Sequence, residues 1–310
     1  MIKYLKNNEI DIVKWDRCIN QSFNGNVYAL SWYLDIAHEG WEALVENDYE
    51  RIMPLPVSKK YSISYMLQPF FIQQLGVFST KRLNPEVINK FINHIPAHIK
   101  YVNINLNSFN KVKNDSLHLV KNNNHTQDLI KEYPLIAKKY STNTKRNLKK
   151  GLKNNLSLMK NIKPEAVINL FQLNKGKQIE KWKSQHYHKL TRLMYSSVYK
   201  GKGLVYGVFT EANQLCAGAF FVKSNNRLIF LFSGADKTAK ETGAMTFLID
   251  SVIREFSPSQ LVLDFEGSND PNLARFYKGF GAKKIEYMGL EINRLTFPFK
   301  QLFALYSLLK

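Results

Sequence analysis

Cysteine is scarce in this chain of 310 residues: Cys18 and Cys216 are its only two, and they lie far apart in the sequence. Two distant cysteines exclude a zinc ribbon, a CxxC redox motif and a disulfide framework, and they are typical of a reducing compartment. Long apolar runs are also missing, since none approaches the ~18 residues that span a bilayer. The first residues, MIKYLKNNEIDIVKW, carry charges where a signal peptide has an apolar core. We therefore expect a cytoplasmic protein.

Acidic side chains are few as well. The chain has 25 of them against 44 lysines and arginines, which gives a formal net charge of +19. A bias toward A/T-rich codons explains an excess of lysine over arginine, but it does not explain a shortage of aspartate and glutamate. The imbalance indicates an anionic partner, and tRNA, an anionic membrane surface and a phosphate-bearing substrate all remain open.

Patterns for a metal site or a nucleophilic triad are absent. His186 and His188 resemble a metal pair, but positions i and i+2 of a helix do not face together, and no acidic or cysteine partner surrounds them. The sequence has no GxSxG motif and no visible Ser-His-Asp arrangement. We expect no bound metal.

Apolar residues are plentiful, at 45% with 13% aromatic, and the length suits about two domains. Residues 87–108 and 246–268 share the order helix, loop, strand, and each strand ends in polar residues. The sequence therefore predicts a tandem duplication of one α/β unit. We place an N-terminal domain over residues 1–137 and a C-terminal domain over residues 138–310.

The second half gives the clearer local pattern. Apolar runs bounded by turn residues predict strands, and apolar residues at helical spacing predict helices. The expected strands cover residues 204–209, 215–222, 227–232 and 261–265, and the expected helices cover residues 242–256 and 271–280.

The segment LDFEGSNDPNLARFYKGFGAKK, residues 263–284, is the most specific part of the chain. Its strand ends in Asp264 and Glu266, which as i and i+2 positions of a strand would point to the same face. A polar turn follows, and Asp270 is placed to cap a helix that begins at Pro271. A helix N-terminus at a strand end suits an anion or a carbonyl oxygen. A capped strand–turn–helix with two solvated acids is the equally plain alternative.

Here the sequence resembles a known family. The run ARFYKGFGA is similar to the A-x-x-LY-x-K-x-GF signature of the GNAT acyltransferase superfamily. The wider run LDFEGS…FYKGFGA, preceded by LFSGAD…TGAMTFLID, resembles the second domain of the Fem-type (FemABX) aminoacyltransferases. The resemblance implies an α/β (α+β) fold of two tandem GNAT-like domains, each a mixed, mainly antiparallel sheet flanked by helices. It also implies a transferase that moves an amino acid from aminoacyl-tRNA to the peptide of a peptidoglycan precursor.

Position and residue type suggest roles for the residues of this segment in amide formation. Asp264 or Glu266 would orient or deprotonate the attacking amine, and Tyr277 or Lys278 would assist the oxyanion or the leaving group. In the same run of matched segments, Ser233 and Ser268 are candidates for contact with the substrate.

A basic stretch from Tyr133 to Pro164 contains no acidic residue. Within it, Arg146, Lys149 and two further lysines are spaced i, i+3, i+4 and i+7, so they share one helix face. Such a face suits phosphate groups, although a solvated lysine face remains open. Fem-type proteins carry a similar S-x-N-x-R-R-N-I-K-K stretch beside the substrate cleft, which implies that Arg146, with Lys149, binds the substrate.

The first half offers one unusual segment, from Gln68 to Gly76, in which glutamines and bulky apolar residues surround Pro69. Glutamine amides can bond a peptide backbone or a sugar, so Gln68 and Gln74 are candidate substrate contacts. A β-bulge in the core is the alternative.

Coenzyme A is the usual donor of GNAT enzymes, which hold its pyrophosphate with a Q/R-x-x-G-x-G/A turn. The matching segment keeps Gly243 and Ala244, but Lys240 replaces Gln or Arg and Glu241 adds a negative charge. We therefore expect no cofactor, and we keep a CoA-dependent N-acyltransferase acting on another amine as an alternative. A non-catalytic binding protein is a second alternative.

The C-terminal run FPFKQLFALYSLLK has the spacing of a helix with one apolar stripe, which consists of Phe299, Leu302, Phe303, Tyr306 and Leu309. We expect this helix to pack on the first domain, with docking to a membrane surface as the alternative.

Overall fold

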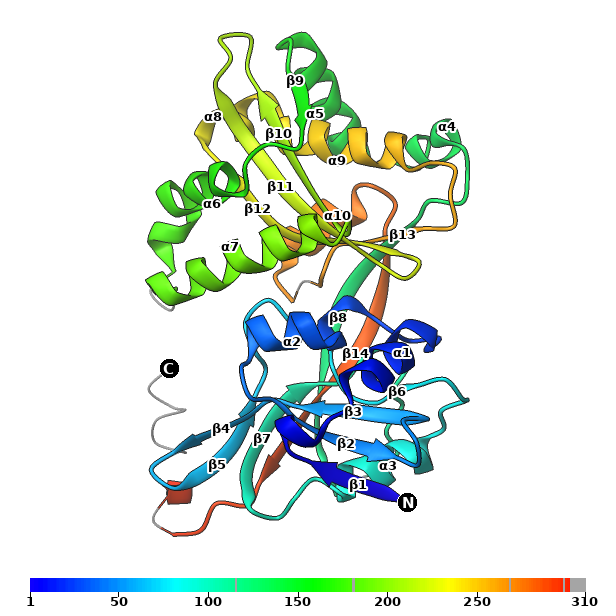
Figure 1. The fold of residues 1–310 in the computed structure, drawn as a ribbon. Coiled ribbons are helices and arrows are strands. Elements are labelled where there is room, and N and C mark those ends of the chain that lie inside the picture. The colour runs from blue at the N-terminus through cyan, green and yellow to red at the C-terminus, as the bar shows by residue number, and fades with distance from the viewer. Residues whose placement is uncertain (115, 180–181, 268, 298, 302–310) are drawn as a thin grey trace. The chain divides into compact units, whose positions relative to one another are not determined.

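The computed structural model describes residues 1–114, 116–179, 182–267, 269–297 and 299–301 (Figure 1). The chain is mixed α/β and divides into two compact units. One unit is Met1–Lys121 with Tyr287–Lys310, and the other is Asn122–Glu286.

This division differs from the boundary at 137/138 that the sequence suggested. Strand β8 (His118–Asp128) begins in the first unit and ends in the second, and β14 (Lys283–Asn293) runs from the second into the first. The chain therefore passes from one unit to the other within a strand, once in β8 and once in β14. No polar linker marks this boundary, because β8 and β14 each continue across it as one unbroken strand.

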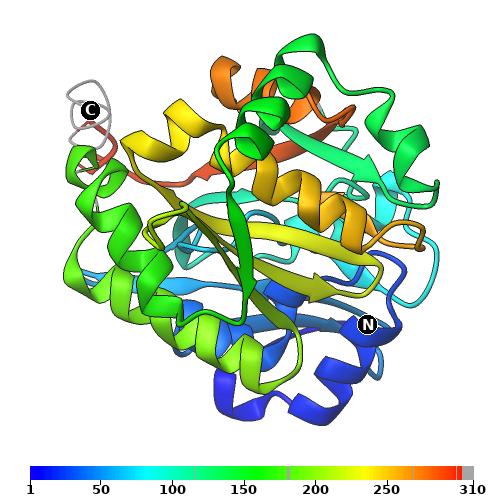
Figure 2. The ribbon, with the colours of Figure 1, turned by 90° about the horizontal axis from the view of Figure 1, so that it is seen from above.

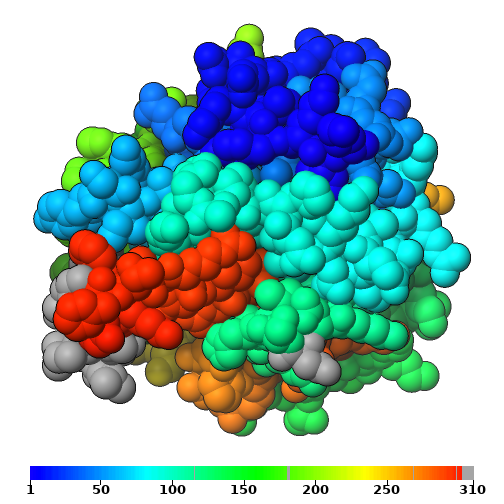
Figure 3. All heavy atoms as spheres, turned by 90° about the horizontal axis from the view of Figure 1, so that it is seen from below, coloured from blue at the N-terminus to red at the C-terminus, as the bar shows by residue number. Residues whose placement is uncertain are grey.

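The first unit contains two groups of strands. Strands β1, β2, β3 and β6 pair in that order, antiparallel throughout. In the other group β4 pairs antiparallel with β5, β5 parallel with β7, and β7 antiparallel with the end of β14. Figure 3 shows the red end of β14 beside the cyan residues of β7. The bounds are β1 (Ile2–Leu5), β2 (Glu42–Glu46), β3 (Arg51–Leu55), β4 (Val57–Lys60), β5 (Ile63–Leu67), β6 (Phe78–Ser79) and β7 (Ile99–Asn105).

The helices of the first unit follow capping and apolar spacing. Asp11 caps α1 and Asn84 caps α3, each by accepting a hydrogen bond from a backbone N–H of the first turn. The apolar face of α3, with Phe91 and Ile92, packs on Val102 of β7, and all three side chains are buried. The bounds are η1 (Asn7–Glu9), α1 (Ile12–Gln21), η2 (Val27–Ala29), α2 (Ser31–Ala37) and α3 (Pro85–Asn93).

The second unit is built on one sheet, in the order β8-β13-β12-β11-β10-β9. Its pairs are antiparallel except for β12 and β13, which are parallel. The strands expected at 204–209, 215–222, 227–232 and 261–265 are confirmed, although the last is shorter. The bounds are β9 (Ser157–Lys160), β10 (Gly203–Phe209), β11 (Leu215–Ser224), β12 (Arg227–Ala235) and β13 (Val262–Asp264).

Helices cover both faces of this sheet (Figures 1 and 2). On one face Gly218 and Gly234 leave room for α6, because a Cβ at either position would press on that helix. On the other face α9 packs its apolar side on the sheet, and α5 crosses α9 at Gly151 beside Phe247. The bounds are α4 (Tyr133–Ala137), α5 (Thr142–Lys153), α6 (Pro164–Leu173), η3 (Lys175–Gln178), α7 (Ser184–Tyr199), α8 (Lys237–Thr242), α9 (Ala244–Glu255) and α10 (Pro271–Lys278).

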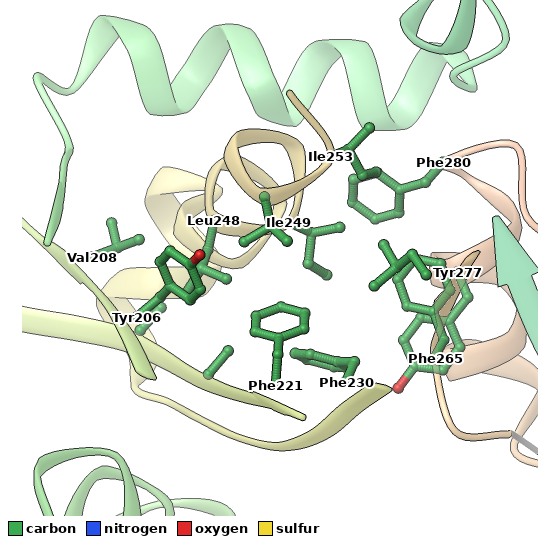
Figure 4. Close-up of a cluster of buried hydrophobic side chains, with 14 of the residues drawn as sticks. Tyr206, Val208, Phe221, Phe230, Leu248, Ile249, Ile253, Phe265, Tyr277 and Phe280 are labelled. Atoms are coloured by element: carbon green, nitrogen blue, oxygen red, sulfur yellow. The ribbon is translucent and has the colours of Figure 1, made fainter. Parts of the chain in front are cut away.

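The main core of the second unit lies between the sheet and α9 (Figure 4). Aromatic side chains from three elements meet there, with Phe221 and Phe230 on strands, Phe265 after β13, and Tyr277 on α10. Leu248 of α9 is fully buried among them. This core fixes the position of α10 against the sheet.

The predicted C-terminal helix falls largely outside the described residues, which include Phe299 of its stripe but not Leu302, Phe303, Tyr306 or Leu309. Phe299 is 44% exposed. Within the described ranges no helix combines the length and the apolar character that a bilayer crossing requires.

Candidate functional site

The strand–turn–helix around residue 270 is formed as predicted at its helix. The Asp270 carboxylate accepts hydrogen bonds from the backbone N–H groups of Asn272 and Leu273, at 2.8 and 3.0 Å, and Pro271 occupies the first turn. Helix α10 is therefore fixed directly after the turn that follows β13, with its last turn carrying Tyr277 and Lys278.

Tyr277 and Lys278 have different environments. The Tyr277 ring is stacked on Phe265, with centroids 4.7 Å apart, and is 7% exposed (Figure 4). Burial raises the pKa of Tyr277, and Glu266 and Asp270 add to the rise, so the phenol is neutral at physiological pH. Lys278 is exposed and lines a cavity.

That cavity, which we call the α5–α10 cavity, has a volume of about 690 Å³. It is lined by the first turns of α5, by one residue of α9 and by α10. Its lining includes no acidic residue. The lining residues are Ser141, Asn143, Thr144, Arg146, Asn147, Thr246, Asn272, Arg275, Phe276, Lys278 and Gly279.

The two helix ends that form the cavity are joined through Gly279. The Ser141 N–H donates to the Gly279 carbonyl at 2.8 Å, and the Ser141 and Thr144 hydroxyls lie 3.0 Å apart. A Cβ at position 279 would overlap the Thr144 hydroxyl, so this close approach requires glycine. The wall of the cavity is therefore set by backbone contact rather than by flexible side chains.

The cavity has a positive charge that its own walls do not neutralise. Arg275 and Lys278 form no ion pair or hydrogen bond through their charged groups with any described residue. Arg146 donates from Nη2 to the neutral Asn143 Oδ1 at 2.8 Å. Three cations around a space of this size attract a phosphate, a carboxylate or a developing oxyanion.

Asp264 is held inside the unit. It is 5% exposed, its Oδ2 accepts from Arg227 at 2.6 Å, and its Oδ1 accepts from Asn124 Nδ2 at 2.8 Å and from the Glu266 N–H at 3.0 Å. Both carboxylate oxygens are thus committed to the fold.

The expected shared face of Asp264 and Glu266 is wrong. Strand β13 ends at Asp264, and Glu266 has a left-handed backbone with φ of 56°, so the two-residue alternation of a strand does not extend to it. The turn needs this conformation to lead into Gly267, whose φ is 78°. Glu266 is half-buried, and its charge acts on Tyr277.

The other sequence candidates lie apart from this cavity or cannot be placed. Lys149 is on the exposed side of α5 and is not in the lining, whereas Arg146 of the same predicted face is. Ser233 is half-buried on β12, opposite Ala219 of β11. Ser268 lies outside the described residues.

Gln68 and Gln74 belong to the first unit and bond to its backbone. Gln68 accepts from the Asn105 N–H and donates to the Ile72 carbonyl, both at 2.8 Å, and Gln74 accepts from the Ser108 N–H at 2.9 Å. These contacts fit the core interpretation of this segment, in which the amides hold an irregular chain in place.

The segment matched to a CoA pyrophosphate turn joins α8 to α9. Lys240 lies inside α8, and the N-terminus of that helix is capped by the Asp236 carboxylate, 2.8 Å from the Ala239 N–H. Gly243 has φ of 79°, and a Cβ there would overlap the carbonyl oxygen of Asn147 from α5. The Asn147 carbonyl oxygen therefore lies against Gly243 at the start of α9, and no side chain caps the N-terminus of that helix among the described residues.

His125 of β8 is a candidate that the sequence did not reveal. It is 1% exposed, and neither ring nitrogen has a hydrogen-bond partner among the described residues. Burial lowers its pKa, and the charges of Lys278 and Lys284 lower it further, so the ring is neutral. Its run, KNNNHTQD, does not alternate between apolar and polar residues, so the sequence does not show which side chains are buried. Arg275, which lines the cavity, was also not among the predicted site residues, although it lies within the motif that resembles the GNAT signature.

Metal-binding groups are not found within the described ranges, where no three His, Cys, Asp or Glu side chains gather to hold an ion. The Nδ1 of His186 accepts from the Lys183 N–H at 2.9 Å.

Comparisons with known proteins give a clear result for the fold. No family model matches the sequence, and no curated protein matches it. FemX is similar in structure with a TM-score of 0.66 and 11% identity, over 97% of this chain and 99% of FemX. L-PGS from Bacillus licheniformis is similar with a TM-score of 0.53 and 10% identity, over 96% of both chains.

A tandem GNAT protein from the clavulanic acid biosynthesis pathway is also similar, with a TM-score of 0.52 and 12% identity, over 96% of this chain and 99% of that one. These proteins are similar in fold to this chain although their sequences are only 10–12% identical to it. The chain therefore has the fold of two tandem GNAT-like domains, as the resemblance in residues 263–284 predicted.

Proposed function

We propose that the chain is an N-acyltransferase that forms an amide on a substrate amine, with aminoacyl-tRNA as the donor and the peptide of a peptidoglycan precursor as the acceptor. The observation that carries this proposal is the α5–α10 cavity, where three cations face a space without an acidic residue. The cavity lies beside the motif that resembles Fem-type transferases, on a fold similar to that of FemX.

The size and charge of the cavity suit the donor end of a tRNA. A volume of about 690 Å³ lies within the range of sites that enclose one small-molecule ligand. Arg146 and Arg275 are placed to hold phosphate groups, since guanidinium matches phosphate oxygens in pairs. The excess of positive charge over the whole chain favours the approach of a polyanion.

The reaction itself balances without another reagent. The acceptor nitrogen forms a bond to the acyl carbon of the aminoacyl ester, and the bond from that carbon to the ribose oxygen breaks. The nitrogen loses one proton and the ribose oxygen gains one. The protein has to hold the amine close to the ester, stabilise the oxyanion and move those protons.

Residues of the second unit are assigned to these tasks. The Lys278 ammonium, exposed on the cavity, stabilises the oxyanion. Glu266, which is outside the cavity lining, is our candidate to orient or deprotonate the amine as it enters, because both oxygens of Asp264 are engaged in the fold. Tyr277 stays protonated and supports α10 from the core side.

Acyl transfer from coenzyme A remains the alternative activity. The Asn147 carbonyl oxygen against Gly243 and the acidic Glu241 in the same segment weigh against it, because neither supplies a donor to a pyrophosphate. A binding protein without catalysis is the other alternative, and the same cavity would then serve to hold an anionic ligand.

A transfer assay separates the three. The full-length protein is incubated with aminoacyl-tRNA carrying labelled amino acids and with a peptidoglycan precursor, and base-stable label on the precursor is measured. We expect labelled product with the wild type and Lys177→Met, an exposed η3 lysine outside the cavity, and little with Lys278→Met. Product from labelled acetyl-CoA instead would support the alternative activity, and tRNA binding without any product would support the binding protein.

A further inference from the structure

A second cavity of the same unit has no part in the proposed transfer. It has a volume of about 380 Å³ and lies at the ends of β8 and β12, beside α4 and the start of β14. Thr126 and Gln127 are the buried polar residues of its wall, and we call it the Gln127 cavity. None of its lining residues lines the α5–α10 cavity.

Positive charge dominates this cavity. Lys131, Lys139 and Lys283 are exposed on its wall, and their ammonium groups form no ion pair or hydrogen bond with the described residues. Arg227 is also in the wall, but it is neutralised by Asp264 at 2.6 Å. The lining contains one acidic residue, Asp128, so three uncommitted cations face one carboxylate.

Gln127 gives the cavity a second, independent feature. Its side chain is 6% exposed, its Nε2 donates to the Asp128 carbonyl at 2.8 Å, and its buried Oε1 accepts no hydrogen bond from the described residues. A buried acceptor without a donor is uncommon in native proteins, because burial removes the water that would satisfy it. The Oε1 acceptor of this amide therefore has room for a donor that the described residues do not supply.

The backbone is shaped to bring that amide to the cavity wall. Gly281 lines the cavity with φ of 82°, and a Cβ there would lie 3.2 Å from Gln127 Oε1 and 3.3 Å from the Cβ of Lys139. Any larger residue would come between the amide and the lysine stem. The glycine thus lets the Gln127 amide and the start of the Lys139 side chain approach the same point of the wall.

We propose that the Gln127 cavity binds a phosphate ester that carries a hydroxyl group near its phosphate, the chemistry of a ribonucleotide. The phosphate is held by Lys139, Lys131 and Lys283, and the hydroxyl donates to Gln127 Oε1. Such a unit is found both in an RNA chain and in a free mononucleotide. The inference stands apart from the proposed transfer, which uses the other cavity.

The test uses the full-length protein and three probes, which are adenosine 5′-monophosphate, inorganic phosphate and a single-stranded RNA oligomer. Binding of the two small probes is measured by titration calorimetry, and binding of the RNA by fluorescence anisotropy at several salt concentrations. The main variant is the double substitution Lys139→Gln with Lys283→Gln, at two exposed positions, so we expect an unchanged melting temperature.

We expect the double variant to bind adenosine 5′-monophosphate at least tenfold more weakly than the wild type, and Lys177→Gln to match the wild type. Gln127→Met should weaken the nucleotide and leave inorganic phosphate unchanged, since the phosphate lacks the hydroxyl. If RNA competes with the nucleotide, the double variant should lower the log–log salt slope of RNA binding by about 0.7 per lost contact. If RNA does not compete, the source is a free nucleotide.

Three outcomes overturn the proposal. One is a wild type that binds neither the nucleotide nor RNA in a saturable way. Another is full affinity in the folded double variant. The third is that Arg275→Gln loses nucleotide binding while the double variant keeps it, which would assign the ligand to the α5–α10 cavity. An unchanged nucleotide affinity in folded Gln127→Met would remove the hydroxyl contact.

Discussion

The two helix-then-strand segments of the chain, α3 to β7 in the first unit and α9 to β13 in the second, share their order but end differently. After β7, the polar residues bond to the backbone of the segment just before β6: Asn107 donates to the Leu75 carbonyl at 3.0 Å, and Asn110 donates to the Val77 carbonyl at 3.0 Å. After β13, the chain turns into α10, which carries Arg275 and Lys278 to a cavity.

The difference shows where chemistry enters a repeated fold. Both strand ends are held by buried polar groups, so those groups mark structure in either unit. Among the described residues, the second unit alone adds a helix with uncommitted cations directly after the strand. The site is therefore defined by helix α10 rather than by the polar residues at the strand end itself.

The largest change in stability should come from removing the buried polar group that holds each strand end, in two separate variants. Asp264→Ala removes a buried carboxylate and leaves the half-buried Arg227 and the buried Asn124 without their partner, and it should lower the free energy of unfolding by about 3–5 kcal/mol. Asn107→Ala removes neutral hydrogen bonds and should cost about 1–3 kcal/mol. Denaturant titrations of both variants measure this. Equal losses would mean that the ion pair adds nothing to the second strand end.

The next effect concerns helix α10, which distinguishes the second unit from the first. Lys278→Met removes one donor for the oxyanion and should lower the turnover of amide formation about 100-fold. The melting temperature should not change, because Lys278 is exposed and unpaired among the described residues. Turnover is measured with saturating substrates. A fall in stability with normal turnover would place Lys278 in the fold instead.

Much of the fold could be predicted from the sequence. The apolar periodicity predicted the strands of the second unit, and the motif at residues 263–284 led to α10 and to the fold. One part of the basic stretch lies on a cavity, since Arg146 is in its lining, although Lys149 of the same predicted face is not. Local patterns are sufficient for such elements because caps, turns and helix faces depend on neighbouring residues.

Other features depended on contacts between distant parts of the chain. The pairing of Asp264 with Arg227 joins residues 37 positions apart, and Asn124 reaches Asp264 across 140 positions. No spacing rule indicates that such an acid is committed to the fold. The passage of the chain between the units within β8 and β14 likewise depends on which strands pair in the fold. The predicted boundary at 137/138 therefore differs from the observed division at residues 121/122 and 286/287.

A moderate effect should distinguish the glutamines of the first unit from site residues. Gln68→Met breaks its bonds to the Asn105 N–H and the Ile72 carbonyl, so it should lower the free energy of unfolding by about 1–3 kcal/mol. Arg275→Met, in contrast, should raise the KM for the donor and leave stability unchanged. A raised KM in a fully stable Gln68→Met variant would return Gln68 to the substrate site.

The smallest effect is a change in pH dependence. Burial lowers the pKa of His125 in the folded protein below the value of about 6.5 expected when it is unfolded. The wild type should therefore lose stability as the pH falls from about 6.5, because the unfolded chain binds the proton more readily. His125→Phe should reduce that loss. Denaturant titrations at pH 7, 6 and 5 compare the two proteins. If the free energy of unfolding depends on pH equally in both, burial does not lower the pKa of His125.

The most direct measurement of the central claim is the salt dependence of tRNA binding. We would titrate tRNA into the wild type, into Arg146→Gln with Arg275→Gln, and into Lys175→Gln with Lys177→Gln as a control of equal charge at exposed positions of η3. If the α5–α10 cavity holds the donor, the arginine pair should lower the log–log salt slope by about 0.7–0.9 for each lost phosphate contact, and the lysine pair should not. Equal slopes for all three proteins would contradict the assignment of this cavity to aminoacyl-tRNA.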